Sequence, residues 1–179
     1  MAIGFLLLTT ATLHGIAFRS FCLADKSLKQ IGANVAYSPE FSSRFMSYLN
    51  SRTTLDLSET DFSDTYLPNL SALPKLHSLR VGSTSIADGF IKRITGCNHL
   101  KAIDVSNTDI GDPFIADLVS SLPNLEIIIA LNTNISDDSL VVCSTMNSLK
   151  KLECVNTKVT GEGLAQLHRV CPELAVVHS

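Results

Sequence analysis

The chain has 179 residues, of which 45% are hydrophobic and 17% are charged, and its formal net charge is −3. These values are typical of one folded domain and exclude a disordered chain. Charge is spread along the sequence without basic blocks, and aromatic residues make up only 6% with no Trp, so no nucleic-acid partner is expected.

An apolar run opens the chain and bears on where the protein is found. Residues 2–18 carry no formal charge, and as a helix they would extend roughly 25 Å, just short of a bilayer core. Three interpretations stay open for residues 1–24: a membrane anchor, a signal peptide cut after Ala24, or a buried helix. Basic residues follow from Arg19 on, so an anchor would keep the rest cytoplasmic, whereas cleavage would export it. We expect a membrane-associated protein, with cytoplasmic and exported proteins as alternatives.

Residues 25–51 are expected to form an N-terminal cap over the units that follow. Apolar side chains recur on both sides of Pro39, and those after it fall on one helical face. The apolar positions are Leu28, Ile31, Val35 and Tyr37 before the proline, and Phe41, Phe45 and Leu49 after it.

A repeat of 24 to 25 residues fills the remainder of the chain, residues 52–179. Its clearest copies begin with LHSLRVGST at 76, LKAIDVSNT at 100, LEIIIALNT at 125 and LKKLECVNT at 149. A degenerate copy, RTTLDLSET, precedes them at 52, and LAVVHS at 174 begins a truncated one. The recurring threonines are Thr60, Thr84, Thr108, Thr133 and Thr157, at intervals of 24, 24, 25 and 24 residues. This regularity predicts a stack of equivalent units.

Each unit is predicted to be a strand, a turn and a helix. Apolar residues two, seven and ten positions after each Thr have helical spacing and form one stripe. An Asp lies four residues after the Thr in four units, where a carboxylate would cap amides or oppose the helix dipole. These residues are Asp64, Asp88, Asp112 and Asp137. The fifth unit has Gly161 and Glu162 there, so we expect its helix to begin less sharply.

The pattern L-x-x-L-x-[LVIAC]-x-x-T followed by [FIV]-x-D resembles the leucine-rich-repeat family over residues 52–179. Thr at the ninth position resembles the cysteine-containing-like subclass and the T-x-[IV]-[ST]-D-x-G-L repeats of bacterial proteins. The resemblance implies an α/β fold, a right-handed leucine-rich-repeat solenoid of about five units plus a truncated strand. It further implies a parallel sheet on the concave face, helices on the convex face, and a role in holding other macromolecules.

Catalytic and metal-binding chemistry is not expected. The sequence has no G-x-S-x-G, phosphate loop, H-E-x-x-H or Gly-rich dinucleotide turn, so we predict no enzyme, no cofactor and no metal. Four cysteines fall in apolar columns of the repeat, where core packing explains them better than reactivity. They are Cys97, Cys143, Cys154 and Cys171.

Two groups of residues on the predicted concave face are the candidate binding site. In the fifth strand position Arg80 falls between Asp56 and Asp104, and neighbouring strands are about 4.8 Å apart, so we expect a charge ladder. LEIIIALNT does not alternate, since its outward positions are apolar too. The resulting apolar stripe consists of Ile127, Ile129, Leu131 and Val155. We expect it to expose on the order of 300 Å².

A surface of this kind favours partner binding. We therefore predict a non-enzymatic protein-interaction module whose partner is a protein or a second copy of the chain, with membrane tethering possible through residues 2–18. The alternatives are a soluble accessory or assembly subunit of an enzyme complex, and an exported binding protein. Cover of the stripe from within the chain also stays open.

Overall fold

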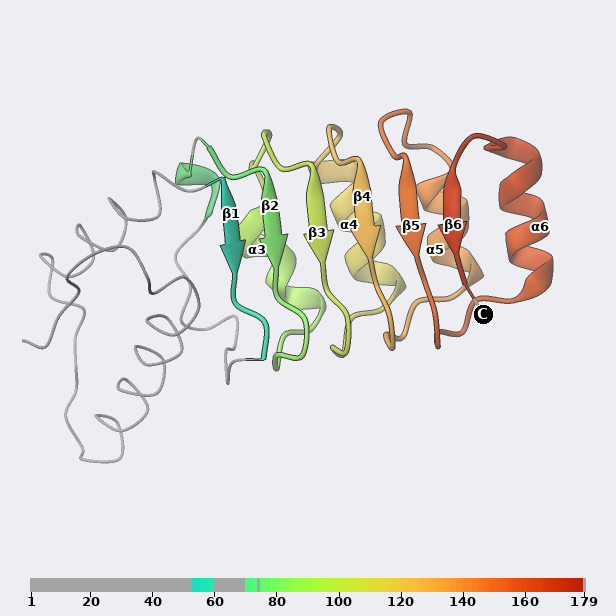
Figure 1. The fold of residues 1–179 in the computed structure, drawn as a ribbon, viewed down its shortest axis with the longest axis horizontal. Coiled ribbons are helices and arrows are strands. Elements are labelled where there is room, and N and C mark those ends of the chain that lie inside the picture. Colours follow the sequence, from blue (N-terminus) through green and yellow to red (C-terminus); the bar gives the residue numbers. More distant parts are fainter. Residues whose placement is uncertain (1–52, 60–69, 74, 179) are drawn as a thin grey trace, which may run out of the picture.

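A computed structural model describes residues 53–59, 70–73 and 75–178, and its strands form one parallel sheet. The six strands are hydrogen-bonded in the order of the sequence, so each unit lies beside the next one (Figure 1). They are β1 Thr54–Asp56, β2 Ser78–Arg80, β3 Ala102–Asp104, β4 Ile127–Ile129, β5 Lys151–Glu153 and β6 Ala175–Val177. The strands of the repeat, including the one in the truncated copy, form as predicted.

Helices connect the strands and lie together on one side of the sheet, as Figure 1 shows. We call the opposite side the concave face. The helical elements are η1 Leu70–Ala72, η2 Asp88–Phe90, α3 Ile91–Ile94, α4 Asp112–Ser121, α5 Asp137–Cys143 and α6 Gly161–Val170. The helix of the second unit is short, because α3 ends at Ile94 and Gly96 follows in the left-handed region with φ 88°. A glycine in that conformation terminates a helix.

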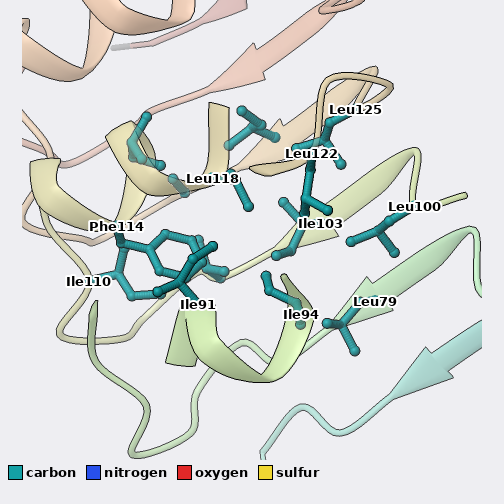
Figure 2. Close-up of a cluster of buried hydrophobic side chains, with 14 of the residues drawn as sticks. Leu79, Ile91, Ile94, Leu100, Ile103, Ile110, Phe114, Leu118, Leu122 and Leu125 are labelled. Atoms are coloured by element: carbon teal, nitrogen blue, oxygen red, sulfur yellow. The ribbon is translucent and has the colours of Figure 1, made fainter. Parts of the chain in front are cut away.

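The core lies between the sheet and the helices, and the predicted inward columns are confirmed. Leu79 and Ile103 of the strands and Ile94 and Leu118 of the helices are 0 to 1% exposed and point into one cluster (Figure 2). In β4 the inward side chain of Ile128 is fully buried. The alternation of side chains along a strand therefore places its neighbours on the concave face.

The recurring Thr closes the turn after each strand. The hydroxyl groups of Thr84, Thr108, Thr133 and Thr157 donate to the carbonyl three residues earlier, at 2.5 to 2.9 Å. The residue before each of them has φ between 52° and 55°, a left-handed conformation in which Asn is enriched among non-glycine residues. Asn occupies this place in three of the four turns. The Thr column is thus structural.

Several predictions fall on residues outside the described ranges. They are the apolar segment of residues 1–24, the cap of residues 25–51, and the positions Thr60 and Asp64. Within residues 53–59, 70–73 and 75–178, no helix combines the length and the apolar character needed to cross a membrane.

Candidate interaction surface

The concave face presents the third, fifth and seventh residues of each unit in matched rows. Strand register places Ile129 between Asp104 on β3 and Glu153 on β5. It likewise places Ile127 between Ala102 and Lys151. The predicted site residues on β3, β4 and β5 therefore lie side by side, as parallel strands about 4.8 Å apart require.

The predicted charge ladder forms on β1 to β3. Arg80 Nη1 lies 3.6 Å from Asp56 Oδ2, and Arg80 Nε lies 3.6 Å from Asp104 Oδ2. Both distances are too long for strong hydrogen bonds, and the Arg80 side chain is 54% exposed, so each pair contributes under about 1 kcal/mol. Asp104 Oδ1 also accepts the N–H of Ser106 at 3.1 Å. The three charges leave a net charge of −1 on this part of the face.

The apolar stripe lies beside the ladder, and its side chains are only half-buried. This holds for Ile127, Ile129, Leu131 and Val155. Lys151 and Glu153 stand opposite the two isoleucines and pair with each other, with Lys151 Nζ 2.6 Å from Glu153 Oε1. Their methylene groups can shield one flank of the stripe. The exposed apolar area is therefore on the order of 150 Å² and not the 300 Å² expected from the sequence.

Short side chains form a low floor around the charge ladder. Ser78 lies opposite Ala102 in the strand register, and Gly82 and Ser106 follow β2 and β3. A Cβ atom on Gly82 would lie 3.1 Å from the carbonyl oxygen of Ser106 and 3.5 Å from Asp104 Oδ1. The face is thus low over β2 and β3 and rises to the aliphatic side chains of β4.

A second group of charges lies at the edge where the helices lead into the strands. Glu126 accepts from Lys101 Nζ at 2.7 Å and from Lys150 Nζ at 2.6 Å, and these two hydrogen bonds lower the pKa of its carboxyl to about 2. The three side chains line an open hollow of about 370 Å³ together with His77, Asn98, His99, Asn124 and Ser148. Sequence reasoning missed this group, although its members recur one residue after the first Leu of their units. Because Glu126 already binds both lysines, the group links neighbouring units.

The recurring aspartates link units in a way that the sequence did not indicate. Asp88, Asp112 and Asp137 accept from the N-cap residue of the following helix: Asp88 Oδ1 accepts the N–H of Gly111, and Asp137 Oδ1 accepts the N–H of Thr160, both at 2.8 Å. Each of the three also lies in the first turn of its own helix, where it opposes the helix dipole as expected, but the expected caps of that helix are not formed by these carboxylates. Since a helix start has free N–H groups and a positive end, a carboxylate from the preceding unit stabilises it equally well.

Asp112 makes the densest of these links, at the start of α5. Its carboxylate accepts the N–H of Ser136 at 2.8 Å, the hydroxyl of Ser136 at 2.7 Å and the N–H of Ser139 at 3.2 Å, and the hydroxyl of Ser139 also donates to it. Burial acts to raise the pKa of Asp112, but the hydrogen bonds from Ser139 and Ser136 outweigh it, so the net pKa is below the ordinary value of 3.8.

The helix of the fifth unit begins sharply, which contradicts the sequence expectation for Gly161 and Glu162. The hydroxyl of Thr160, the N-cap of α6, accepts the N–H of Gly163 at 3.1 Å and donates to Asp137 Oδ2 at 2.7 Å. Thr160 thus caps its own helix, as Ser136 caps α5 in the preceding unit.

The cysteines of the repeat pack as predicted, with one difference. Burial raises the pKa of Cys97 and Cys154 to about 11 and that of Cys143 to about 12. Cys171 is only half-buried, because it lies in the last described helical column. Within the described part of the chain, no three His, Cys, Asp or Glu side chains gather closely enough to hold a metal ion.

Comparison with solved structures finds the same architecture in two bacterial proteins. Internalin C2 of Listeria monocytogenes is 23% identical and superposes with a TM-score of 0.56 over 73% of this chain and 53% of its own. A leucine-rich-repeat protein of Leptospira interrogans is 15% identical, with a TM-score of 0.51 over 72% of this chain and 31% of its own. The chain thus spans about half and about a third of their lengths. No family model matches the sequence, and no curated protein matches it either.

These similarities define the fold. The chain is an α/β leucine-rich-repeat solenoid, with a parallel sheet on one face and helices on the other. The subclass suggested by Thr in the ninth position stays a prediction.

Proposed function

We propose that this chain is a non-enzymatic protein-interaction module, and that its concave face contacts a polypeptide partner through the apolar stripe and the charge ladder. The observation that carries the proposal is the unit of β4, where Ile127, Ile129 and Leu131 place three aliphatic side chains on one sheet face. Over β1 to β3 the same face carries only short or charged side chains in the third, fifth and seventh positions. Nothing in the packing of the core demands aliphatic residues there, because Ile128 and Ala130 fill the inward columns.

Burial of the apolar stripe would supply part of the free energy of an interface. Removing on the order of 150 Å² of apolar surface from water yields roughly 4 kcal/mol at 25 cal/mol per Å². Association entropy reduces this gain, so the polar contacts around the stripe must contribute as well. A small apolar centre with a polar rim is the usual anatomy of a reversible protein interface.

The test uses 12-residue peptides selected from a random display library on the full-length protein. Their affinity is then measured by fluorescence anisotropy for a stripe variant, Ile129→Gln with Leu131→Gln, which leaves the charge unchanged. The matched control is Val141→Gln with Val170→Gln, two valines that are 59% and 63% exposed on α5 and α6. We expect the stripe variant to bind about tenfold or more weakly, equivalent to about 1.4 kcal/mol, and the control to bind as the wild type does. Loss of binding in the control alone would place the interface on the helices and refute the proposal.

Membrane tethering through residues 2–18 and action as a subunit of an enzyme complex are separate extensions of this proposal. Carbonate extraction of membranes tests the first, because a tethered chain stays in the pellet. Co-purification of the native chain with an enzyme, lost in the stripe variant, tests the second.

A further inference from the structure

The charge ladder and the apolar stripe are adjacent, and their arrangement restricts the chemistry of a partner. Register places Asp104 directly beside Ile129, so a partner that covers the stripe also meets the ladder. Resting on the proposed function, we infer that the partner segment is an extended polypeptide in which an aliphatic side chain is accompanied, two or four residues away, by a Lys or Arg that binds the ladder carboxylates.

The ladder carboxylates lie farther from their cation than the carboxylate of Glu153 does. Glu153 forms a close ion pair with Lys151, at 2.6 Å. Asp56 and Asp104 instead share Arg80, each at 3.6 Å. Asp56 and Asp104 each also accept one backbone N–H, from Ser58 and Ser106. A second cation can approach Asp56, whose side chain is 44% exposed, more freely than Asp104, which is 15% exposed, and at neither does it have to break a close ion pair. An incoming carboxylate would find Arg80 flanked on both sides by negative charge.

The net charge of the concave face also favours a positively charged partner. The charged side chains described on the strands of this face are Asp56, Arg80, Asp104, Lys151 and Glu153, which sum to −1. Lys151 and Glu153 cancel, so the excess negative charge of the face lies on the ladder, and a positive group is attracted there.

The side chains next to Asp104 are short. Gly82 has none, and a Cβ there would lie 3.1 Å from the Ser106 carbonyl oxygen, while Ser78, Ala102 and Ser106 are small. A Lys or Arg could lie along this floor with its methylene groups on the sheet and its charge at Asp104, in the manner of amphipathic side chains at interfaces.

Strand spacing sets the distance between the two features of the partner. Asp104 is one strand from Ile129 and Asp56 is three strands away, about 5 Å and about 14 Å at 4.8 Å per strand. An extended chain rises about 3.3 Å per residue and points alternate side chains to the same side. A basic residue two or four positions from the aliphatic one therefore reaches one of the two carboxylates.

The experiment uses the peptides selected on the full-length protein and a ladder variant, Asp56→Asn with Asp104→Asn. Asn keeps the acceptor that Ser106 N–H needs, so the turn is preserved. The matched control is Asp109→Asn with Asp117→Asn, which removes the same charge from two exposed residues off the strands. We expect the selected peptides to be enriched in Lys or Arg at the stated spacing. We also expect tenfold or greater weakening in the ladder variant at 50 mM salt, less at 500 mM, and little change in the control.

Failure of this inference is distinct from failure of the proposed function. If the ladder variant binds the peptides as the wild type does while the stripe variant does not, the basic partner is wrong and the concave interface stands. If neither variant weakens binding, both are wrong. If light scattering shows a dimer that the stripe variant abolishes, the occupant is a second copy of the chain and the peptide partner is refuted.

Discussion

The aspartate links between units predict a ranking of stabilities, of which Asp112 is the extreme case. Asp112 accepts four hydrogen bonds from Ser136 and Ser139, Asp137 accepts two from Thr160, and Asp88 accepts one from Gly111. Replacing an Asp by Ala leaves its donors without that acceptor, and the loss of stability should grow with their number. We therefore expect Asp112→Ala to be the most destabilising, followed by Asp137→Ala and then Asp88→Ala.

The loss of stability expected for Asp112→Ala can be estimated from the hydrogen bonds that these donors make. A hydrogen bond to a charged group contributes about 1.5 to 3 kcal/mol, but the donors at this half-buried helix start regain water when the carboxylate is removed. We expect a loss of about 3 kcal/mol, which in a chain of this size lowers the Tm by roughly 6 to 12 °C. The control is Asp117→Ala, an exposed position on the same helix, with an expected change within about 0.5 kcal/mol.

The dependence on pH gives this prediction a second readout. Because the pKa of Asp112 is lowered in the folded chain, its contribution is complete above the ordinary value of 3.8 and is lost as the pH falls through the folded value. The stability difference between wild type and Asp112→Ala, measured by urea unfolding, should therefore be largest near pH 7 and shrink below pH 3.8. Equal losses for Asp112→Ala and Asp117→Ala, or a difference that grows in acid, would refute the reasoning.

Two further predictions concern packing. Gly163→Ala should destabilise the protein by about 1 to 3 kcal/mol, because the new Cβ would collide with the carboxylate of Asp137, whereas Gly161→Ala in the same helix meets nothing within 4 Å and should be neutral or stabilising by up to about 1 kcal/mol. Thermal unfolding of the pair checks this, and equal Tm values would contradict it. In native protein, thiol labelling followed by peptide mapping should modify Cys171 well before Cys143, whose burial raises its pKa to about 12. Labelling of Cys143 at the rate of Cys171 would show that α5 does not cover the core as described.

The sequence predicted the strands and the inward columns because those features are local. Alternation along a strand assigns Ile128 to the core and Ile129 to the opposite face without knowledge of any other unit. The 24-residue period then carries this assignment through the stack. The position of Arg80 between Asp56 and Asp104 followed from the period and the strand spacing alone.

Features that depend on the neighbouring unit were not predictable in the same way. Helix capping is predicted from residues up to three positions apart in the sequence, whereas Asp112 accepts from donors 24 and 27 residues away. The neighbours of Ile129 on the face, Asp104 and Glu153, are 25 and 24 residues away along the chain, and Glu153 is held by Lys151. Both features depend on how neighbouring units pack on each other. The sequence shows the length of the repeat but not the contacts between units.

Some features are set within one unit and others by the neighbouring unit. This difference also explains at which positions the sequence can vary without loss of the fold. The inward positions repeat apolar residues in every unit because each must fill the same space between the sheet and the helices. The fifth strand position faces away from the core, and in successive units it holds Asp56, Arg80, Asp104, Ile129, Glu153 and Val177. A residue there is selected by its cross-strand neighbours and by whatever contacts the face. Ile129 lies between two carboxylates, where a Lys would pair with both, so packing within the sheet gives no reason for an aliphatic residue at this point. The proposed partner would supply that reason, and this makes the unit of β4 the place to test for it.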